Sequence, residues 1–215
     1  MATGIIHIAI DGSVASGKGT IARELSKRLG IPCLDTGAMY RGVGIFLDEH
    51  GIDKLVNMDM DARIENGITR IFIDGKDVTG KLRENHVSRL ASHAGTIPAV
   101  RAICIAKAQE IASGMSLIME GRDICNICMP DAKYKFLITA PVKVRAMRRF
   151  DELVAKSQNV TYKEVLRQTK KRDRQDRKHG FKKVKDAIII KNGGNKSVDE
   201  VVKYMHSYIN NCQVS

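Results

Sequence analysis

Short apolar runs alternate along the chain with longer segments in which apolar residues recur every three or four positions. Five runs have the length and β-branched character of strands, at residues 5–10, 32–34, 116–119, 134–139 and 187–190. The segment after the first run places Ile21, Ala22, Leu25 and Leu29 on one side of a predicted helix, which should end at Gly30. Strands that alternate with helices in this way predict an α/β fold, a five-stranded parallel sheet with helices on both faces.

Residues 62–78 depart from this pattern. Asn66-Gly67 and Asp74-Gly75 are turn signals of tight β-hairpins, and a β-rich run lies between them. We therefore expect three short antiparallel strands, inserted as a small lobe between two crossovers of the parallel core.

Two later helices are predicted by capping boxes, in which a hydroxyl residue and a glutamate three positions later bond each other's backbone amides. The pairs are Thr161 with Glu164, and Ser197 with Glu200. The first of these helices runs into a strongly basic segment. The second carries a stripe of apolar residues at Val201, Val202, Met205 and Ile209.

Length and composition favour one large domain, because 215 residues with 43% hydrophobic content can build a substantial core. No run approaches the roughly 18 apolar residues of a membrane span, and the first residues lack a signal-peptide layout, so we expect a cytoplasmic protein. Five scattered cysteines, an odd number, favour free thiols. Cys125 and Cys128 have no second pair and no nearby histidine, so we do not expect a zinc site.

The net charge of +12 is concentrated in one segment: residues 143–185 hold 16 Lys or Arg against 5 Asp or Glu. A basic surface with interleaved aromatic residues would favour nucleic-acid binding, but this segment contains only Phe150, Tyr162 and Phe181. A basic cluster that closes over polyphosphate explains the charge equally well.

The residues after the first predicted strand carry the most specific chemical signal, and they read Gly12-Ser13-Val14-Ala15-Ser16-Gly17-Lys18-Gly19-Thr20. Glycines at both ends let backbone N–H groups turn inward around an anion, and the following helix directs its positive end to the same place. Lys18 can then reach β- and γ-phosphate oxygens, and the Thr20 hydroxyl can face Mg²⁺. The alternative is a glycine-rich turn without a ligand. The GKGT ending looks like that of the nucleoside monophosphate kinases.

Two further polar clusters follow predicted strands. Residues 34–41 read Leu-Asp-Thr-Gly-Ala-Met-Tyr-Arg, and residues 119–123 read Met-Glu-Gly-Arg-Asp. Because ligands of open α/β sheets gather outside the carboxyl ends of the strands, these clusters and the phosphate loop should share one cleft. Taken alone, Thr36 could be a helix cap, Arg41 a solvated charge, and Arg122 with Asp123 an internal ion pair.

With the phosphate loop, residues 34–41 closely resemble bacterial cytidylate kinase. Further matches run in order along nearly the whole chain, at Ser92, Arg101, Gly121-Arg122-Asp123, Pro130-Asp131-Ala132, Arg172-Asp173 and Asp176. The resemblance implies that the chain transfers the γ-phosphate of ATP, with Mg²⁺, to CMP or dCMP, as a monomer without nucleic-acid or membrane partners. It also implies a core of residues 1–57, 97–157 and 186–215, an inserted NMP-binding lobe at 58–96 and a basic helical lid at 158–185.

The resemblance also implies a role for each matched residue. The CMP-binding set is Thr36, Tyr40, Arg41, Ser92, Arg101, Arg122, Asp123, Arg172, Asp176 and His179. ATP is held by residues 12–20 with Arg145 and Arg149, and Thr20 orients the metal. The catalytic cations are Lys18, Arg122, Arg172 and Arg177. Within the CMP set, Ser92, Arg101 and Asp123 read cytosine, whose exocyclic amine can donate to a carboxylate.

The chain departs from the family pattern in two places. His179 stands where the family has arginine and is followed by Gly180-Phe181-Lys182, and Cys125-Asn126 replaces Gly-Thr. Arg177 is the alternative for the missing lid arginine, and Arg148 is either a nucleotide ligand or a surface charge.

The residues leave two rival functions open. One is a phosphate-loop kinase of another small acceptor, such as UMP, AMP or shikimate; the other is a basic nucleic-acid-binding ATPase. A GTPase is not favoured, because Asn195-Lys196-Ser197-Val198 has valine where the guanine-reading aspartate belongs.

Overall fold

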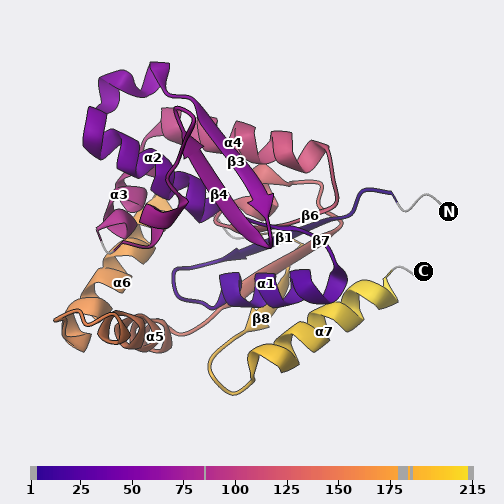
Figure 1. The fold of residues 1–215 in the computed structure, drawn as a ribbon. Helices are drawn as coiled ribbons and strands as arrows, with labels where there is room; N and C mark the ends of the chain where they lie inside the picture. The colour runs from indigo at the N-terminus through magenta and orange to yellow at the C-terminus, as the bar shows by residue number, and fades with distance from the viewer. Residues whose placement is uncertain (1–3, 85, 179–183, 185, 213–215) are drawn as a thin grey trace.

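Residues 4–84, 86–178, 184 and 186–212 are described by the computed structural model. In this part of the chain a five-stranded parallel sheet lies at the centre, in the order β2-β6-β1-β7-β8 (Figure 1). The strands are β1 (His7–Gly12), β2 (Cys33–Asp35), β6 (Leu117–Gly121), β7 (Tyr134–Thr139) and β8 (Ile188–Lys191). The predicted strands and their parallel pairing are confirmed, with ends that differ from the prediction by two residues at most.

Helices cover both faces of this sheet, as predicted (Figure 1). On one face α1 (Lys18–Leu29) and α7 (Val198–Asn211) pack against Ile8 and Ile10 of β1. On the other face α2 (Thr36–His50) and α4 (Pro98–Ser113) pack against Ala9 and Leu34. Successive residues of β1 are therefore buried on opposite faces, which is why the strand reads as one continuous apolar run.

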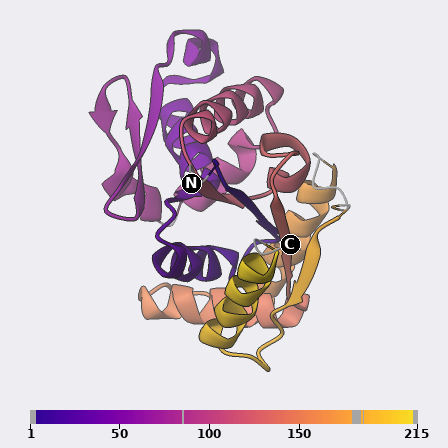
Figure 2. The ribbon, with the colours of Figure 1, turned by 90° about the vertical axis from the view of Figure 1, so that its right-hand side faces the viewer.

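The inserted lobe contains the predicted antiparallel sheet, β3 (Met60–Glu65), β4 (Ile68–Ile73) and β5 (Lys76–Asp77). Both hairpin turns have the positive φ angles that their sequences predict: Asn66 52°, Gly67 73°, Asp74 49° and Gly75 73°. A turn η1 (Ile52–Asn57) precedes the sheet, and η2 (Thr79–Arg83) and α3 (Val87–Ala94) follow it. In both views the small sheet lies beside α2, on the opposite side of the central sheet from α7 (Figures 1 and 2).

A polar contact at the end of β2 helps to join the lobe to the core. The hydroxyl of Thr69 on β4 accepts a hydrogen bond of 2.9 Å from the backbone N–H of Asp35. Gly42 of α2 allows β4 to approach closely, because a Cβ atom there would lie 2.6 Å from Ile71. The small sheet therefore supports the corner where β2 enters α2.

The basic segment forms two helices, α5 (Val142–Ala155) and α6 (Tyr162–Lys178). Both predicted capping boxes are present, at Thr161 with Glu164 and at Ser197 with Glu200. Helix α6 buries only Val165 and Thr169 among its residues, so little apolar packing holds it against the rest of the molecule. Within the described part of the chain no helix has the length and apolar character needed to cross a membrane.

Candidate nucleotide-binding site

The phosphate loop joins β1 to α1 at the carboxyl edge of the sheet. Ala15 and Gly17 have positive φ angles of 56° and 91°, so the loop backbone turns twice within three residues. A Cβ atom on Gly12 would lie 2.7 Å from the carbonyl oxygen of Ile138, so only glycine fits at that position. The Ser16 hydroxyl is buried without a hydrogen-bond partner. The loop is shaped as a cradle for an anion, as its sequence predicts.

Lys18 and Glu120 form an ion pair beside this loop, with Nζ and Oε2 3.6 Å apart. The two side chains are 15% and 8% exposed. Burial lowers the pKa of Lys18 and raises the pKa of Glu120, and the attraction between the two charges opposes both shifts. Gly19 permits this approach, because a Cβ atom there would lie 2.9 Å from Oε1 of Glu120.

A cavity of about 270 Å³ opens next to Lys18 and brings together the acceptor residues predicted from the sequence. Helices α1 to α6 and the ends of β2 and β6 contribute to its wall. The predicted residues that line it are Thr36, Tyr40 and Arg41 from α2, Ser92 from α3, Arg101 from α4, Arg122 and Asp123 after β6, and Arg172 and Asp176 from α6.

Arg101 and Asp123 form the wall expected to read the base. Their ion pair joins Nη2 to Oδ2 at 2.9 Å, while Oδ1 of Asp123 is buried without a partner. Asp123 has a left-handed backbone with φ of 61° and is 3% exposed. A buried carboxylate oxygen that accepts no hydrogen bond costs free energy, and a ligand that donates a hydrogen bond to it removes that cost.

The α2 residues have different partners. The Thr36 hydroxyl donates to the carbonyl oxygen of Glu120 at 3.0 Å, so it fixes the helix start against β6. Arg41 lies 3.5 Å from Asp35, and both side chains are about one-third exposed. Burial raises the pKa of the Tyr40 phenol, which is therefore neutral at physiological pH. Arg41 is the member of this group with a charge available to a phosphate.

Two arginines reach the cavity, Arg122 after β6 and Arg172 from α6. Arg122 and Asp176 form an ion pair of 2.5 Å that links the end of β6 to α6. Arg172 has its Nε buried without a hydrogen-bond partner. Burial, followed by repulsion from Arg122, lowers the pKa of Arg172 to about 9, so the protein groups around Arg172 compensate its charge only in part.

One predicted lid residue does not line the cavity, and another lies outside the described part of the chain. Arg177 is exposed, and its Nε donates to the backbone carbonyl of Asp173 on its own helix at 3.2 Å. His179 lies outside the described residues. Thr20, the predicted metal residue, is exposed on the first turn of α1 and is absent from the cavity wall.

The α5 arginines contact the phosphate loop from outside. Arg145 is 5% exposed, donates to the Val14 carbonyl at 3.3 Å, and forms a two-pronged ion pair with Asp173 at 2.9 and 2.6 Å. Arg148 donates to the Ser16 carbonyl at 3.3 Å, so it is a loop contact rather than a surface charge. Arg149 pairs with Glu152 at 2.7 Å and lines the cavity. Arg145 and Arg149 are the two arginines predicted to hold ATP. The guanidinium group of Arg145 is already bonded to Val14 and Asp173.

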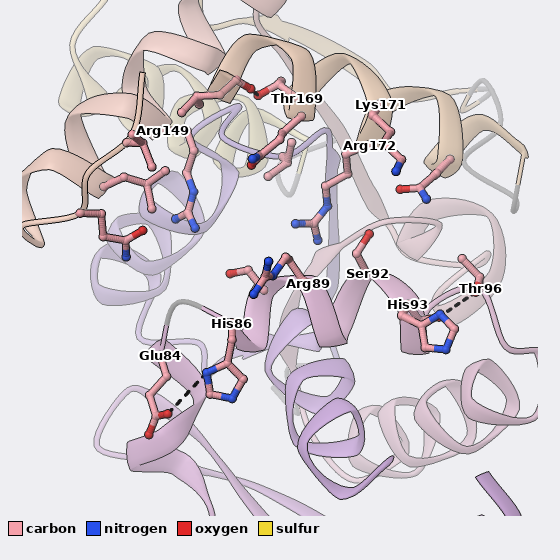
Figure 3. A pocket seen from close by; sticks show the side chains of 18 residues that line it. Glu84, His86, Arg89, Ser92, His93, Thr96, Arg149, Thr169, Lys171 and Arg172 are labelled. Atoms are coloured by element: carbon pink, nitrogen blue, oxygen red, sulfur yellow. Dashed lines mark hydrogen bonds and ion pairs between the residues drawn. The ribbon is translucent and has the colours of Figure 1, made fainter. Parts of the chain in front are cut away.

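A larger cavity of about 1010 Å³ continues outward between α3 and the helices α5 and α6. Figure 3 shows Arg149 and Arg172 directed from the upper helices toward α3, where Ser92 points back to them. Ser92, Arg149 and Arg172 line both cavities, so the two spaces form one cleft. Its shape is that of a gap between two lobes that approach each other around a ligand.

Comparison with known proteins assigns the chain to a family. The family model described as cytidylate kinase matches residues 8–211. The chain belongs to the cytidylate kinase family. A cytidylate kinase of Caldanaerobacter subterraneus subsp. tengcongensis is 36% identical over 211 residues, covering 95% of this chain and 94% of the relative. A cytidylate kinase of Fervidobacterium nodosum is 38% identical over 203 residues, covering 91% and 92%.

Solved structures agree on the fold. The shikimate kinase of Bacteroides thetaiotaomicron superimposes with a TM-score of 0.52 at 11% identity, covering 95% of this chain and 98% of that chain. The shikimate kinase of Acinetobacter baumannii gives a TM-score of 0.50 at 15% identity, covering 99% and 97%. At such identities the likeness concerns the phosphate-loop kinase fold alone. The predicted fold class and the predicted family are confirmed.

Several residues of this cytidylate kinase family site were given no role in the sequence analysis. Glu120 was quoted within a motif only, although an acid that ends a strand beside the phosphate-loop strand is a signal that could have identified it. Asp173 was noted as a lid match without a partner. Asn192, which is 6% exposed and donates to the Ser16 carbonyl at 2.8 Å, follows β8 and lies 176 positions from its partner, so no local pattern predicts the contact.

The donor chemistry of the site fits Mg²⁺. The carboxylates of Asp35 and Glu120 line the cavity beside Lys18. No group of three or more His, Cys, Asp or Glu side chains suited to a metal occurs among the described residues. Kinases commonly bind Mg²⁺ through one or two carboxylates together with substrate phosphates, and this arrangement requires no complete protein cage.

Proposed function

We propose that this chain transfers the γ-phosphate of ATP, as its magnesium complex, to CMP or dCMP. The observation that carries the proposal is the Arg101–Asp123 pair, which lines the same cavity as Lys18 and leaves one buried carboxylate oxygen without a partner. Cytosine offers an exocyclic amine to this oxygen, whereas uracil would present a carbonyl oxygen and leave a buried charge unpaired.

Each substrate has its own set of residues in this proposal. The loop amides, Lys18 and Arg149 hold ATP. Arg41 and Arg122 hold the acceptor phosphate, and Ser92 supports the base-reading pair. Asp176 leaves Arg122 when the acceptor phosphate arrives, because phosphate offers the same guanidinium a stronger, two-pronged partner.

Transfer needs no dedicated catalytic base, because phosphoryl transfer depends mainly on alignment and charge neutralisation. Lys18 neutralises charge on the donor, and Arg172, whose pKa is lowered by burial and by repulsion from Arg122, neutralises the group in transit. Mg²⁺, when bound, would supply positive charge to the phosphates, and Asp35, Glu120 and the Thr20 hydroxyl are the groups that would hold it. The described lid cations approach from α6, and closing that helix over the cleft excludes water as a competing acceptor.

The inserted lobe 58–96 and the lid 158–185 are in this proposal the two moving parts of the chain. The lobe supports the acceptor side through Thr69 and Asp35, and the lid covers both substrates. We expect the chain to act as a monomer.

The test is a coupled assay of ADP release with Mg²⁺, using CMP, dCMP, UMP and AMP as acceptors. CMP and dCMP should be used, and UMP should be at least about tenfold poorer in kcat/KM. The variant Asp123→Asn should narrow the difference between CMP and UMP, because its amide can donate to the uracil carbonyl. Equal use of UMP and CMP by the unmodified chain would remove the cytosine assignment, and no acceptor-dependent ADP would remove the kinase assignment.

A further inference from the structure

Arg145 connects three parts of the chain through one guanidinium group. Its Nε donates to the Ala140 carbonyl at 2.9 Å, and its Nη1 donates to the Val14 carbonyl at 3.3 Å. Nη1 and Nη2 together bind both carboxylate oxygens of Asp173 on the lid helix. Four of the five N–H groups of this guanidinium donate hydrogen bonds inside the protein, and the residue is 5% exposed. Few of its hydrogen bonds therefore remain available to a nucleotide.

The contact with Val14 bears on the phosphate cradle through the geometry of the peptide bond. In a planar trans peptide the carbonyl of Val14 and the N–H of Ala15 point in opposite directions. Because Arg145 holds the carbonyl outside the loop, the Ala15 N–H is directed inward, to the side where phosphate binds. Arg148 and Asn192 hold the Ser16 carbonyl in the same way and so orient the N–H of Gly17.

The contact with Asp173 extends this chain of hydrogen bonds to the lid. Asp173 lies one position after Arg172 and three before Asp176, two of the α6 residues that line the acceptor cavity. A displacement of α6 that brings these residues to CMP therefore moves the carboxylate that fixes Arg145. Since α6 buries only Val165 and Thr169, polar contacts such as the Arg145–Asp173 and Arg122–Asp176 ion pairs help to hold this helix beside the phosphate loop.

We propose that Asp173 is a positioning residue that, through Arg145, couples the lid helix to the phosphate loop. Binding of CMP under the lid then orders the Ala15 amide for ATP, and ATP in the loop favours the lid position that holds CMP. Linkage requires that the two effects be equal. The inference rests on the proposed function, because it takes ATP and CMP as the two ligands.

The experiment measures the dissociation constant of a non-hydrolysable ATP analogue with Mg²⁺, by titration calorimetry, with and without saturating CMP. The ratio of the two constants is the coupling factor. For the unmodified chain we expect a factor of about 10, within the usual range of such couplings. In Asp173→Asn the amide directs a donor at the guanidinium, and in Arg145→Lys one ammonium cannot contact both Val14 and Asp173. In each variant the factor should fall to about 1–2.

Two controls separate coupling from general damage. Asp151→Asn makes the same acid-to-amide change at an exposed position of α5 that lines neither cavity. Met205→Ala removes a fully buried side chain of α7 on the opposite face of the sheet, so it lowers stability without touching the connection. Both controls should keep the factor of the unmodified chain.

A further measurement uses the unmodified chain, so it does not depend on whether a variant folds. Amide hydrogen exchange at residues 12–13 and 16–17, loop positions that do not line the acceptor cavity, should slow when CMP alone is added. Unchanged exchange, an unchanged factor in Asp173→Asn or Arg145→Lys, a factor of 1 in the unmodified chain, or an equal loss in Met205→Ala would each overturn the coupling. Failure of the unmodified chain to phosphorylate CMP would count instead against the proposed function.

Discussion

Replacing Lys18 by alanine removes two interactions at once, and the structure gives a magnitude for each. The first is the charge directed at the transferring phosphate. Its loss should lower turnover about 100-fold or more, which corresponds to about 3 kcal/mol on the rate scale. The second is the ion pair with Glu120, whose side chain is 8% exposed. Removing one partner of a buried pair costs about 3–5 kcal/mol, and the residual exposure of both groups favours the lower end.

The stability loss in Lys18→Ala should depend on pH in a defined direction. Burial already raises the pKa of Glu120, and without Lys18 that pKa rises further. At pH values between the usual glutamate pKa and the raised one, Glu120 is protonated in the folded variant and ionised in the unfolded chain. Stability therefore falls as pH rises through this interval, by at most about 1.4 kcal/mol per pH unit. The full deficit is present above the raised pKa and shrinks toward acid pH.

The double variant Lys18→Ala with Glu120→Gln separates the two losses. Glutamine leaves no buried charge, so denaturant unfolding should show most of the lost stability restored, while the coupled ADP assay should show turnover as low as in Lys18→Ala. Near-normal turnover in Lys18→Ala would refute the phosphate-loop assignment. A double variant no more stable than the single one would refute the assignment of the stability loss to Glu120.

Three further predictions concern the acceptor side. Asp123→Ala should lower kcat/KM for CMP about 100-fold or more while leaving the KM for ATP within about threefold, because a buried charge-assisted contact to the base is lost; steady-state kinetics with each substrate varied would check it, and equal losses for both would contradict it. Thr69→Val should raise the KM for CMP and cost about 1–3 kcal/mol in unfolding free energy, because the Asp35 N–H loses its acceptor; an unchanged KM for CMP would show that the lobe does not serve the acceptor. Gly121→Ala should destabilise the chain by about 1–3 kcal/mol, because the new Cβ would lie within 2.9 Å of Ile124 and even closer to the Thr36 hydroxyl; thermal unfolding at or above the normal temperature would contradict that packing.

Local sequence determined the elements of this fold because each depends on neighbours along the chain. The phosphate loop follows from glycine positions, the small sheet from two hairpin turns with positive φ, and the starts of α6 and α7 from capping boxes. The parallel sheet followed from continuous apolar runs, which arise where both faces of a strand are buried. Most acceptor residues were also predictable, because they follow strands that end at one edge of the sheet.

Tertiary structure alone decided which charges meet. Lys18 and Glu120, and Arg145 and Asp173, are far apart in the chain, and their pairing depends on strand order and on where α6 lies. The sequence around a charged residue does not identify its ion-pair partner, because electrostatic attraction depends on distance in space and on burial. The sequence therefore determined that this chain has a phosphate loop and a basic lid, and only the packing of α5 and α6 decided that Arg145 binds the loop and the lid rather than presenting its fork to the cleft.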